Sequence, residues 1–174
     1  MKKFKFIFIS SVILFIIMSL IHFVYDFLKL DIIAIYFPVN ESIFQHMKMI
    51  FTAFFIFYLG IYLTRKKFGF NNTFLTNLIS VLTCIIFFLI IYLPIYYTLG
   101  DNMIFTFILL FISIMLGQFI SYNTLLNKKR SSLNIMAICF IVIMFIVFGY
   151  FTFNPIHNDL FWDFKHGTYE KVTK

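Results

Sequence analysis

The chain has 174 residues, of which 62% are hydrophobic and only 12% are charged. Soluble domains are about 45–50% apolar and about 25% charged, so this composition excludes an ordinary water-soluble domain and indicates that the lipid bilayer is the solvent. The formal net charge of +7 is explained by basic loops, as described below, and nucleic acid is therefore not an expected partner.

Five apolar stretches are long enough to cross a bilayer, which takes about 20 residues in a helix. The first follows the basic start MKKFK. It is longer than the core of a signal peptide, and no small-residue cleavage site follows it, so we expect an uncleaved first helix. The five predicted spans cover, approximately, residues 6–27, 41–63, 75–97, 103–122 and 133–153, and a polar tail occupies residues 154–174.

These spans predict an all-α fold class. In lipid, backbone groups have to be hydrogen-bonded within their own segment, so each span is expected to be an α-helix. The short alternating strands of a membrane barrel are absent from the sequence, and no repeat or linker marks a second domain. The sequence therefore predicts a polytopic helical membrane protein that forms a single bundle over residues 1–174.

Basic residues in the short loops predict the orientation of the chain, because Lys and Arg gather on the cytoplasmic side. The loop between the third and fourth spans has neither residue. We therefore expect the N-terminus in the cytoplasm, the C-terminus outside, and a multi-pass protein of the cell membrane. The basic residues on the predicted inner side are Lys2, Lys3, Lys5, Arg65, Lys66, Lys67, Lys128, Lys129 and Arg130.

Acids and histidines are distributed in the opposite way. On this topology all of them lie at the outer ends of spans, in outer loops or in the tail. Acids contribute little to orientation, so the positive-inside rule does not explain this placement. The outer face is predicted to hold His22, Asp26, Asp31, Glu41, His46, Asp101, His157, Asp159, Asp163, His166 and Glu170.

The first pair in chain order is His22 and Asp26, near the end of the first span. Residues four apart share one face of a helix. The two side chains could be two metal ligands, or a ligand and the carboxylate that orients it. Alternatively they form a hydrogen-bonded pair at the interface that reaches water.

The segment FPVNESIFQHMK, residues 37–48, opens the second span. Asn40 is a good N-cap, and Glu41 beside it is favoured by the helix dipole. Alternatively Ser42 caps the helix and Gln45 completes a capping box. Capping explains these polar residues without any further function.

Capping does not explain His46 and Lys48, which continue into the apolar segment. Polar side chains in lipid are costly, so the two residues favour a site. Glu41 and His46 are five residues apart, which is about 140° around a helix. A regular helix could not aim both at one small site, whereas a frayed first turn would let Glu41 reach inward as a ligand or base.

The tail supplies further histidines and acids: His157, Asp159, Asp163 and His166. Its aromatic residues, including Trp162, suit an anchor at the membrane interface. An anchor would not need the histidines, so the tail could also fold over the mouth of the bundle as a lid. Polar residues inside the third and fourth spans, such as Ser80 and Gln118, are expected to form hydrogen bonds between helices.

The segments HFVYDF (22–27), FPVNESIFQHMK (37–48) and the tail resemble a family of small bacterial polytopic membrane proteins with no assigned function. The shared motif is V-N-E-S-x-x-x-H-x-K, matched by Val39, Asn40, Glu41, Ser42, His46 and Lys48. The abundance of Phe, Ile, Lys and Asn is also typical of an AT-rich bacterial genome. The resemblance supports the choice of residues and implies no reaction.

A fainter similarity is to zinc membrane hydrolases of the ceramidase and adiponectin-receptor type, which carry N-E followed by a histidine at a helix start. This chain has five predicted spans instead of seven, and its last span lacks H-x-x-x-H. The similarity prompts a metal hypothesis without supplying ligands.

The most concrete hypothesis is metal-assisted hydrolysis or transfer on a lipid-linked substrate at the outer membrane face. Zinc suits histidine and carboxylate ligands with one open position. We expect His22, His46 and His157 as ligands and either Asp26 or Glu41 as the catalytic base or the supporting carboxylate. Further polar residues of the site are expected to be Asn40, Ser42, Lys48, Asp159 and His166.

Two alternatives stay open. The first is a non-enzymatic binding or assembly protein in which the polar cluster is a structural hydrogen-bond network. The second is a small transporter subunit, although the middle spans lack the charged residues that mark most transport paths.

Overall fold

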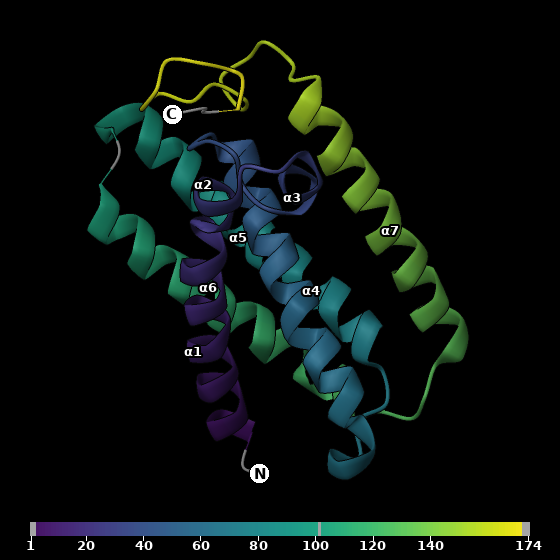
Figure 1. Ribbon diagram of the computed structural model, residues 1–174. Helices are drawn as coiled ribbons and strands as arrows, with labels where there is room; N and C mark the ends of the chain where they lie inside the picture. Colours follow the sequence, from purple (N-terminus) through teal and green to yellow (C-terminus); the bar gives the residue numbers. More distant parts are fainter. Residues whose placement is uncertain (1–2, 101, 172–174) are drawn as a thin grey trace. The chain divides into compact units, whose positions relative to one another are not determined.

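The computed structural model of the chain describes residues 3–100 and 102–171 (Figure 1). Lys2 and Asp101, which entered the charge arguments, lie outside the described residues. Within the described part the structure is helical and has no strand, apart from one isolated bridge between Asp163 and Thr168. The helices are α1 (Lys3–His22), α2 (Val24–Leu28), α3 (Asp31–Tyr36), α4 (Ile43–Phe68), α5 (Thr73–Leu99), α6 (Met103–Leu126) and α7 (Ser131–Phe153).

Among the described residues, five helical segments are long and apolar enough to cross a membrane, which confirms the predicted spans as helices. The first of them, Lys3–Leu28, combines α1 and α2. α4 continues to Phe68, past the apolar stretch, because Arg65, Lys66 and Lys67 in its last turn interact favourably with the negative end of the helix dipole. The short helix α3 was not expected from the sequence.

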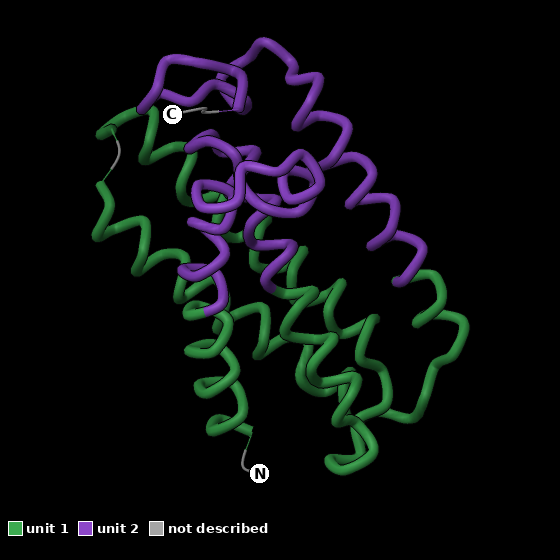
Figure 2. Tube along the Cα trace, in the orientation of Figure 1, with its two compact units in different colours: residues 1–16, 54–137 green, residues 17–53, 138–174 purple. Residues whose placement is uncertain are grey.

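The chain divides into two compact units, coloured separately in Figure 2. Unit 1 comprises Met1–Ile16 and Phe54–Ala137, and unit 2 comprises Ile17–Ala53 and Ile138–Lys174. α1, α4 and α7 each contribute residues to both units. The expected single bundle stays a prediction.

In unit 1, α5 and α6 pack closely. A Cβ at Gly117 of α6 would lie 2.5 Å from the backbone oxygen of Ser80 in α5, so only glycine allows this approach. The buried amide of Gln118 donates to Ser80 Oγ at 3.2 Å and accepts from the hydroxyls of Tyr58 and Ser10 at 3.1 and 3.3 Å. The prediction of hydrogen bonds between helices is confirmed for Gln118 and Ser80.

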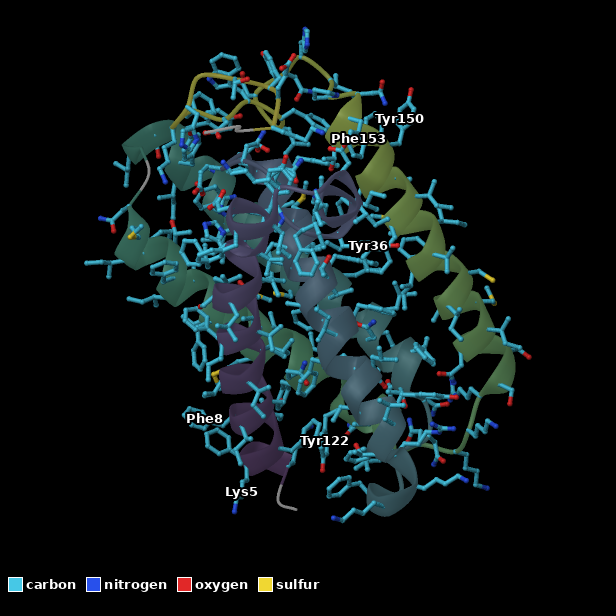
Figure 3. The ribbon with its side chains drawn as sticks, viewed as in Figure 1. Lys5, Phe8, Tyr36, Tyr122, Tyr150 and Phe153 are labelled. Carbon is cyan, nitrogen blue, oxygen red and sulfur yellow. The ribbon has the colours of Figure 1, made fainter. Side chains whose placement is uncertain are left out.

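The core of unit 2 is largely aromatic. The rings of Phe44 in α4 and Phe161 in the tail stack with centroids 4.3 Å apart. Outside this core, the exposed Tyr36 of α3, labelled in Figure 3, packs edge-on against Phe145 of α7 with ring centroids 5.4 Å apart. These contacts hold the tail against α4 and α3 against α7, and so they position the polar groups described next.

Candidate functional site

The start of α4 is organised by two polar side chains. Asn40 Oδ1 accepts a hydrogen bond from the backbone N–H of Ser42 at 3.0 Å, and Ser42 Oγ accepts from the N–H of Gln45 at 3.4 Å. Ser42 is therefore the capping residue. Gln45 does not complete a capping box, because its Oε1 accepts no hydrogen bond and the N–H of Ser42 donates to Asn40 instead. The amide nitrogen of Gln45 donates to Thr152 Oγ1 of α7 at 3.3 Å.

Glu41 precedes the first helical residue, so the helical spacing of Glu41 and His46 does not limit where its carboxylate points. Glu41 Oε2 lies 3.5 Å from His46 Nε2, and Glu41 Oε1 lies 3.4 Å from Nε2 of His22, the last residue of α1. The two imidazole rings are 5.6 Å apart. His22, Glu41 and His46 therefore converge, and their ligand atoms all lie within 4.8 Å of one another.

The tautomer of His46 follows from its second hydrogen bond. His46 Nδ1 lies 2.9 Å from the backbone oxygen of Ser42, which can only accept, so Nδ1 carries the proton. In the neutral ring Nε2 then presents its lone pair toward the carboxylate of Glu41. Two lone-pair groups attract each other only through a proton or a metal ion, and metal-binding histidines commonly donate their other ring N–H to a carbonyl in this way.

The electrostatics of the site keep Glu41 ionised. The hydrogen bond with His22 lowers the pKa of Glu41 most, and desolvation opposes it. The positive charge that His46 and His22 carry when protonated and the hydrogen bond with Lys165 lower this pKa further. The net result is a pKa of about 2. Glu41 is thus an anionic ligand or ion-pair partner at neutral pH and not a proton donor.

A pocket of about 360 Å³ lies beside these residues. One part of its wall is apolar, and the rest carries acids, lysines and histidines. Asp26, from α2, is exposed on this wall and faces the same space as Glu41. The ion-pair partner of His22 is Glu41. The lining residues are His22, Phe23, Asp26, Lys29, Pro38, Val39, Asn40, Glu41, Lys165 and His166.

The tail reaches the site through Asp163, whose side chain is completely buried. Its carboxylate accepts hydrogen bonds from the backbone N–H groups of Glu41 and Lys165 at 2.9 Å and of His166 at 3.1 Å, and from His166 Nδ1 at 2.8 Å. The turn closes at Gly167, whose φ of +65° lies in the region that glycine tolerates.

Further contacts bind the tail to the start of α4. The N–H of Phe44 donates to the backbone oxygen of Leu160 at 2.9 Å. The side-chain amide of Asn40 donates to the backbone oxygen of Glu170 at 3.1 Å. The ammonium group of Lys165 lies 3.2 Å from Glu41 Oε1. The tail therefore supplies part of the pocket wall, and its role as a lid stays a prediction.

Three predicted site residues lie apart from the converging group. His157 is exposed and stacks on Tyr169 with ring centroids 4.5 Å apart, and Asp159 is exposed in the same part of the tail. Lys48 is completely buried and donates to the backbone oxygen of Ala34 at 2.7 Å and to Thr152 Oγ1 at 2.8 Å. The structure thus brings Glu41, rather than His157, to the two histidines.

Asp163 and Lys165 were not among the predicted site residues. The run DFKHGT carries a local signal, because an aspartate that accepts from the next N–H groups and a following glycine are typical of a turn. Nothing in that run indicates that the same carboxylate binds the N–H of Glu41, 122 residues away.

The sequence model of a protein family, described as a family of unknown function (DUF6512), matches residues 1–171, and the chain belongs to that family. No curated protein and no solved structure matches the chain. The expected membership of a family without an assigned function is confirmed, while its bacterial origin and the motif around Glu41 stay predictions.

Proposed function

We propose that this member of the family is a multi-pass membrane protein with a zinc site formed by His22, Glu41 and His46. The site would catalyse hydrolysis or group transfer on a lipid-linked substrate at the extracytoplasmic face. The observation that carries the proposal is the convergence of two imidazole nitrogens and one carboxylate oxygen within 4.8 Å of one another.

The donor set fits zinc. Catalytic zinc sites use three protein ligands, two histidines and a glutamate among the known sets, and leave a fourth position open. Glu41 is ionised, as a ligand must be. The hydrogen bond from His46 Nδ1 to the oxygen of Ser42 orients the ring with Nε2 toward the other two ligands.

Zinc, when bound, polarises a carbonyl or phosphoryl oxygen and acidifies a coordinated water molecule. The residues around it would bind and orient the substrate and accept a proton. Because Glu41 lies between the histidines, its proposed role is that of a ligand, and Asp26 on the pocket wall is the proposed base. Phe23 and Val39 provide an apolar wall for a lipid-linked substrate.

The proposed position of the site on the extracytoplasmic side rests on the distribution of basic residues in the loops. Five helices are long and apolar enough to cross a membrane, and the basic loops support an N-terminus in the cytoplasm. With five crossings, the end of α1, the start of α4 and the tail belong to the extracytoplasmic side. A pocket at that level suits the head group of a lipid-linked substrate, since the apolar part can stay in the bilayer.

The test is metal content. The full chain is purified in detergent without a chelator, and bound metals are measured by mass spectrometry. We expect close to stoichiometric zinc, and its loss in His22→Ala, His46→Ala and Glu41→Gln. His157→Ala is the matched control, because His157 is an exposed histidine outside the group. Absence of metal from the native protein, or equal retention in all variants, contradicts the proposal.

A second candidate function is a binding or assembly protein in which the polar cluster is structural. It is favoured by the ion pair between Lys165 and Glu41 and by the hydrogen bond from Glu41 N–H to Asp163, which need no metal. On this alternative Glu41→Gln lowers the thermal stability of a protein that contains no metal. The same metal measurement therefore separates the two functions.

A further inference from the structure

Lys165 occupies a position that bears directly on the proposed metal site. Its ammonium nitrogen lies 3.2 Å from Glu41 Oε1, the same oxygen that lies 3.4 Å from His22 Nε2. The tail thus places a cation on the carboxylate oxygen that faces one of the two histidines.

We infer that Lys165 and a metal ion compete for Glu41, so that the ammonium group holds the metal-free site and withdraws when the ion binds. The inference rests on the proposed metal site and adds a regulatory element to it. A divalent ion bound to Glu41 repels an ammonium group a few ångströms away, because like charges at this distance destabilise each other even where water screens them.

Withdrawal of Lys165 requires only its side chain to move. The side chain is 66% exposed, so water can solvate the released ammonium group. Its backbone N–H stays bound to Asp163 Oδ1 at 2.9 Å. The turn of the tail can therefore remain docked while the ammonium group leaves, and the competition is confined to one flexible side chain.

Lys171 provides a matched control in the same tail. Its ammonium group forms an ion pair with Asp31, at 2.6 Å, and not with Glu41. Replacing either lysine by glutamine removes one positive charge from the tail, but only the change at Lys165 frees Glu41. Lys165→Arg keeps the charge and serves as the conservative variant.

The first measurement is zinc affinity, with Zn²⁺ alone as the probe. Chelator-stripped full chain in detergent is titrated against a chromogenic zinc chelator. We expect Lys165→Gln to bind zinc more tightly, by up to about fivefold, because the competing exposed ion pair is lost. Lys165→Arg and Lys171→Gln should bind no more tightly than the native chain.

The second measurement is the reactivity of the two amines toward an acylating reagent, quantified by peptide mass spectrometry. Because coupling between two cations is reciprocal, zinc should increase the acylation of Lys165 and leave that of Lys171 unchanged. A structural ion pair indifferent to metal would show no change at Lys165.

The outcomes are distinguishable. If the native chain binds zinc and Lys165→Gln has the same affinity, the competition is refuted while the proposed metal site stands. Equal tightening by Lys171→Gln refutes it as well, since a general charge effect would then explain the result. If neither the native chain nor any variant binds zinc, the proposed function fails and the competition fails with it.

Discussion

The carboxylate of Asp163 accepts a hydrogen bond from the backbone N–H of Glu41 at 2.9 Å, and this bond joins segments 122 residues apart. Burial raises the pKa of Asp163, but the hydrogen bonds from Glu41, His166 and Lys165 outweigh burial, so the pKa lies below its usual range. A buried, ionised carboxylate therefore fixes the backbone that presents Glu41 to the two histidines.

Asp163→Asn should loosen this arrangement. The amide group has one acceptor oxygen and loses the charge, so some of the four N–H donors are left unsatisfied. Hydrogen bonds to charged groups contribute about 1.5–3 kcal/mol each, and we expect a loss of that order in the free energy of unfolding. Zinc affinity should also fall, because Glu41 is less well positioned.

Thermal unfolding in detergent and a zinc titration measure these two effects. Asp159→Asn is the control, because Asp159 is an exposed acid of the same tail. Unchanged stability of Asp163→Asn would show that the tail does not depend on this carboxylate.

Removing the hydroxyl of Thr152, which accepts a hydrogen bond from Lys48, should destabilise the fold. The buried amino group of Lys48 donates to Thr152 Oγ1 and to the backbone oxygen of Ala34, and the side-chain amide of Gln45 donates to the same hydroxyl. Thr152→Val would leave two buried donors without that acceptor, at a cost of about 1–3 kcal/mol. Lys48→Met keeps the apolar stem without the amine and should cost less than Thr152→Val, because it removes the buried donor itself, whereas Thr152→Val leaves buried donors without an acceptor.

Unfolding midpoints of the two variants in detergent test whether Thr152→Val is more destabilising than Lys48→Met. Lys48→Met should also retain zinc, since Lys48 is not among the residues that line the pocket. A larger cost for Lys48→Met than for Thr152→Val would contradict this ranking, whereas the loss of zinc would assign Lys48 a role in the site.

Gly117→Ala should destabilise the packing of α5 and α6. The added Cβ would lie 2.5 Å from the backbone oxygen of Ser80, which cannot move aside as a side-chain end can. Forced overpacking typically costs about 1–3 kcal/mol. Gly60→Ala in α4 is the control, because nothing lies within 4 Å of its Cβ, and alanine there favours the helix by up to about 1 kcal/mol.

Thermal unfolding of the two glycine variants in the same detergent provides the comparison. Equal midpoints would mean that α5 and α6 do not approach closely at Gly117.

The orientation is open to a direct test with reporters. A reporter that is active only outside the cytoplasm, fused after the last residue, should be active, whereas fusion after Lys67 should be inactive. The physical reason is the retention of Lys and Arg loops on the cytoplasmic side. An inactive C-terminal fusion with an active one after Lys67 would invert the topology and place the pocket in the cytoplasm.

The sequence predicted the long apolar helices well, because their signal is local: in lipid, a run of apolar residues has to satisfy its backbone within the run. It missed α3 (Asp31–Tyr36), since six residues are too few to show the periodic spacing of apolar residues that marks a helix. The capping role of Ser42 was one of two alternatives, and the hydrogen bond to Gln45 N–H decided between them.

The site was predicted in part. The sequence singles out His22, Glu41 and His46, which the structure brings together. It proposes His157 as the third ligand and Glu41 as a base or supporting carboxylate, and those roles stay predictions. The sequence places the start of the second span near Glu41 and lets its carboxylate reach inward only from a frayed first turn. Because α4 begins at Ile43, Glu41 is free of helical geometry and its carboxylate reaches both histidines.

By itself, the sequence determined that the chain is helical, where its apolar segments lie, and which residues carry acid–base and ligand chemistry, because these properties depend on composition and short-range spacing. Only the tertiary structure decided which of those residues meet. The pairing of Glu41 with His22, Asp163 and Lys165 joins three distant segments. Such contacts depend on how helices and tail pack, for example through Phe44 and Phe161, and no local pattern encodes them.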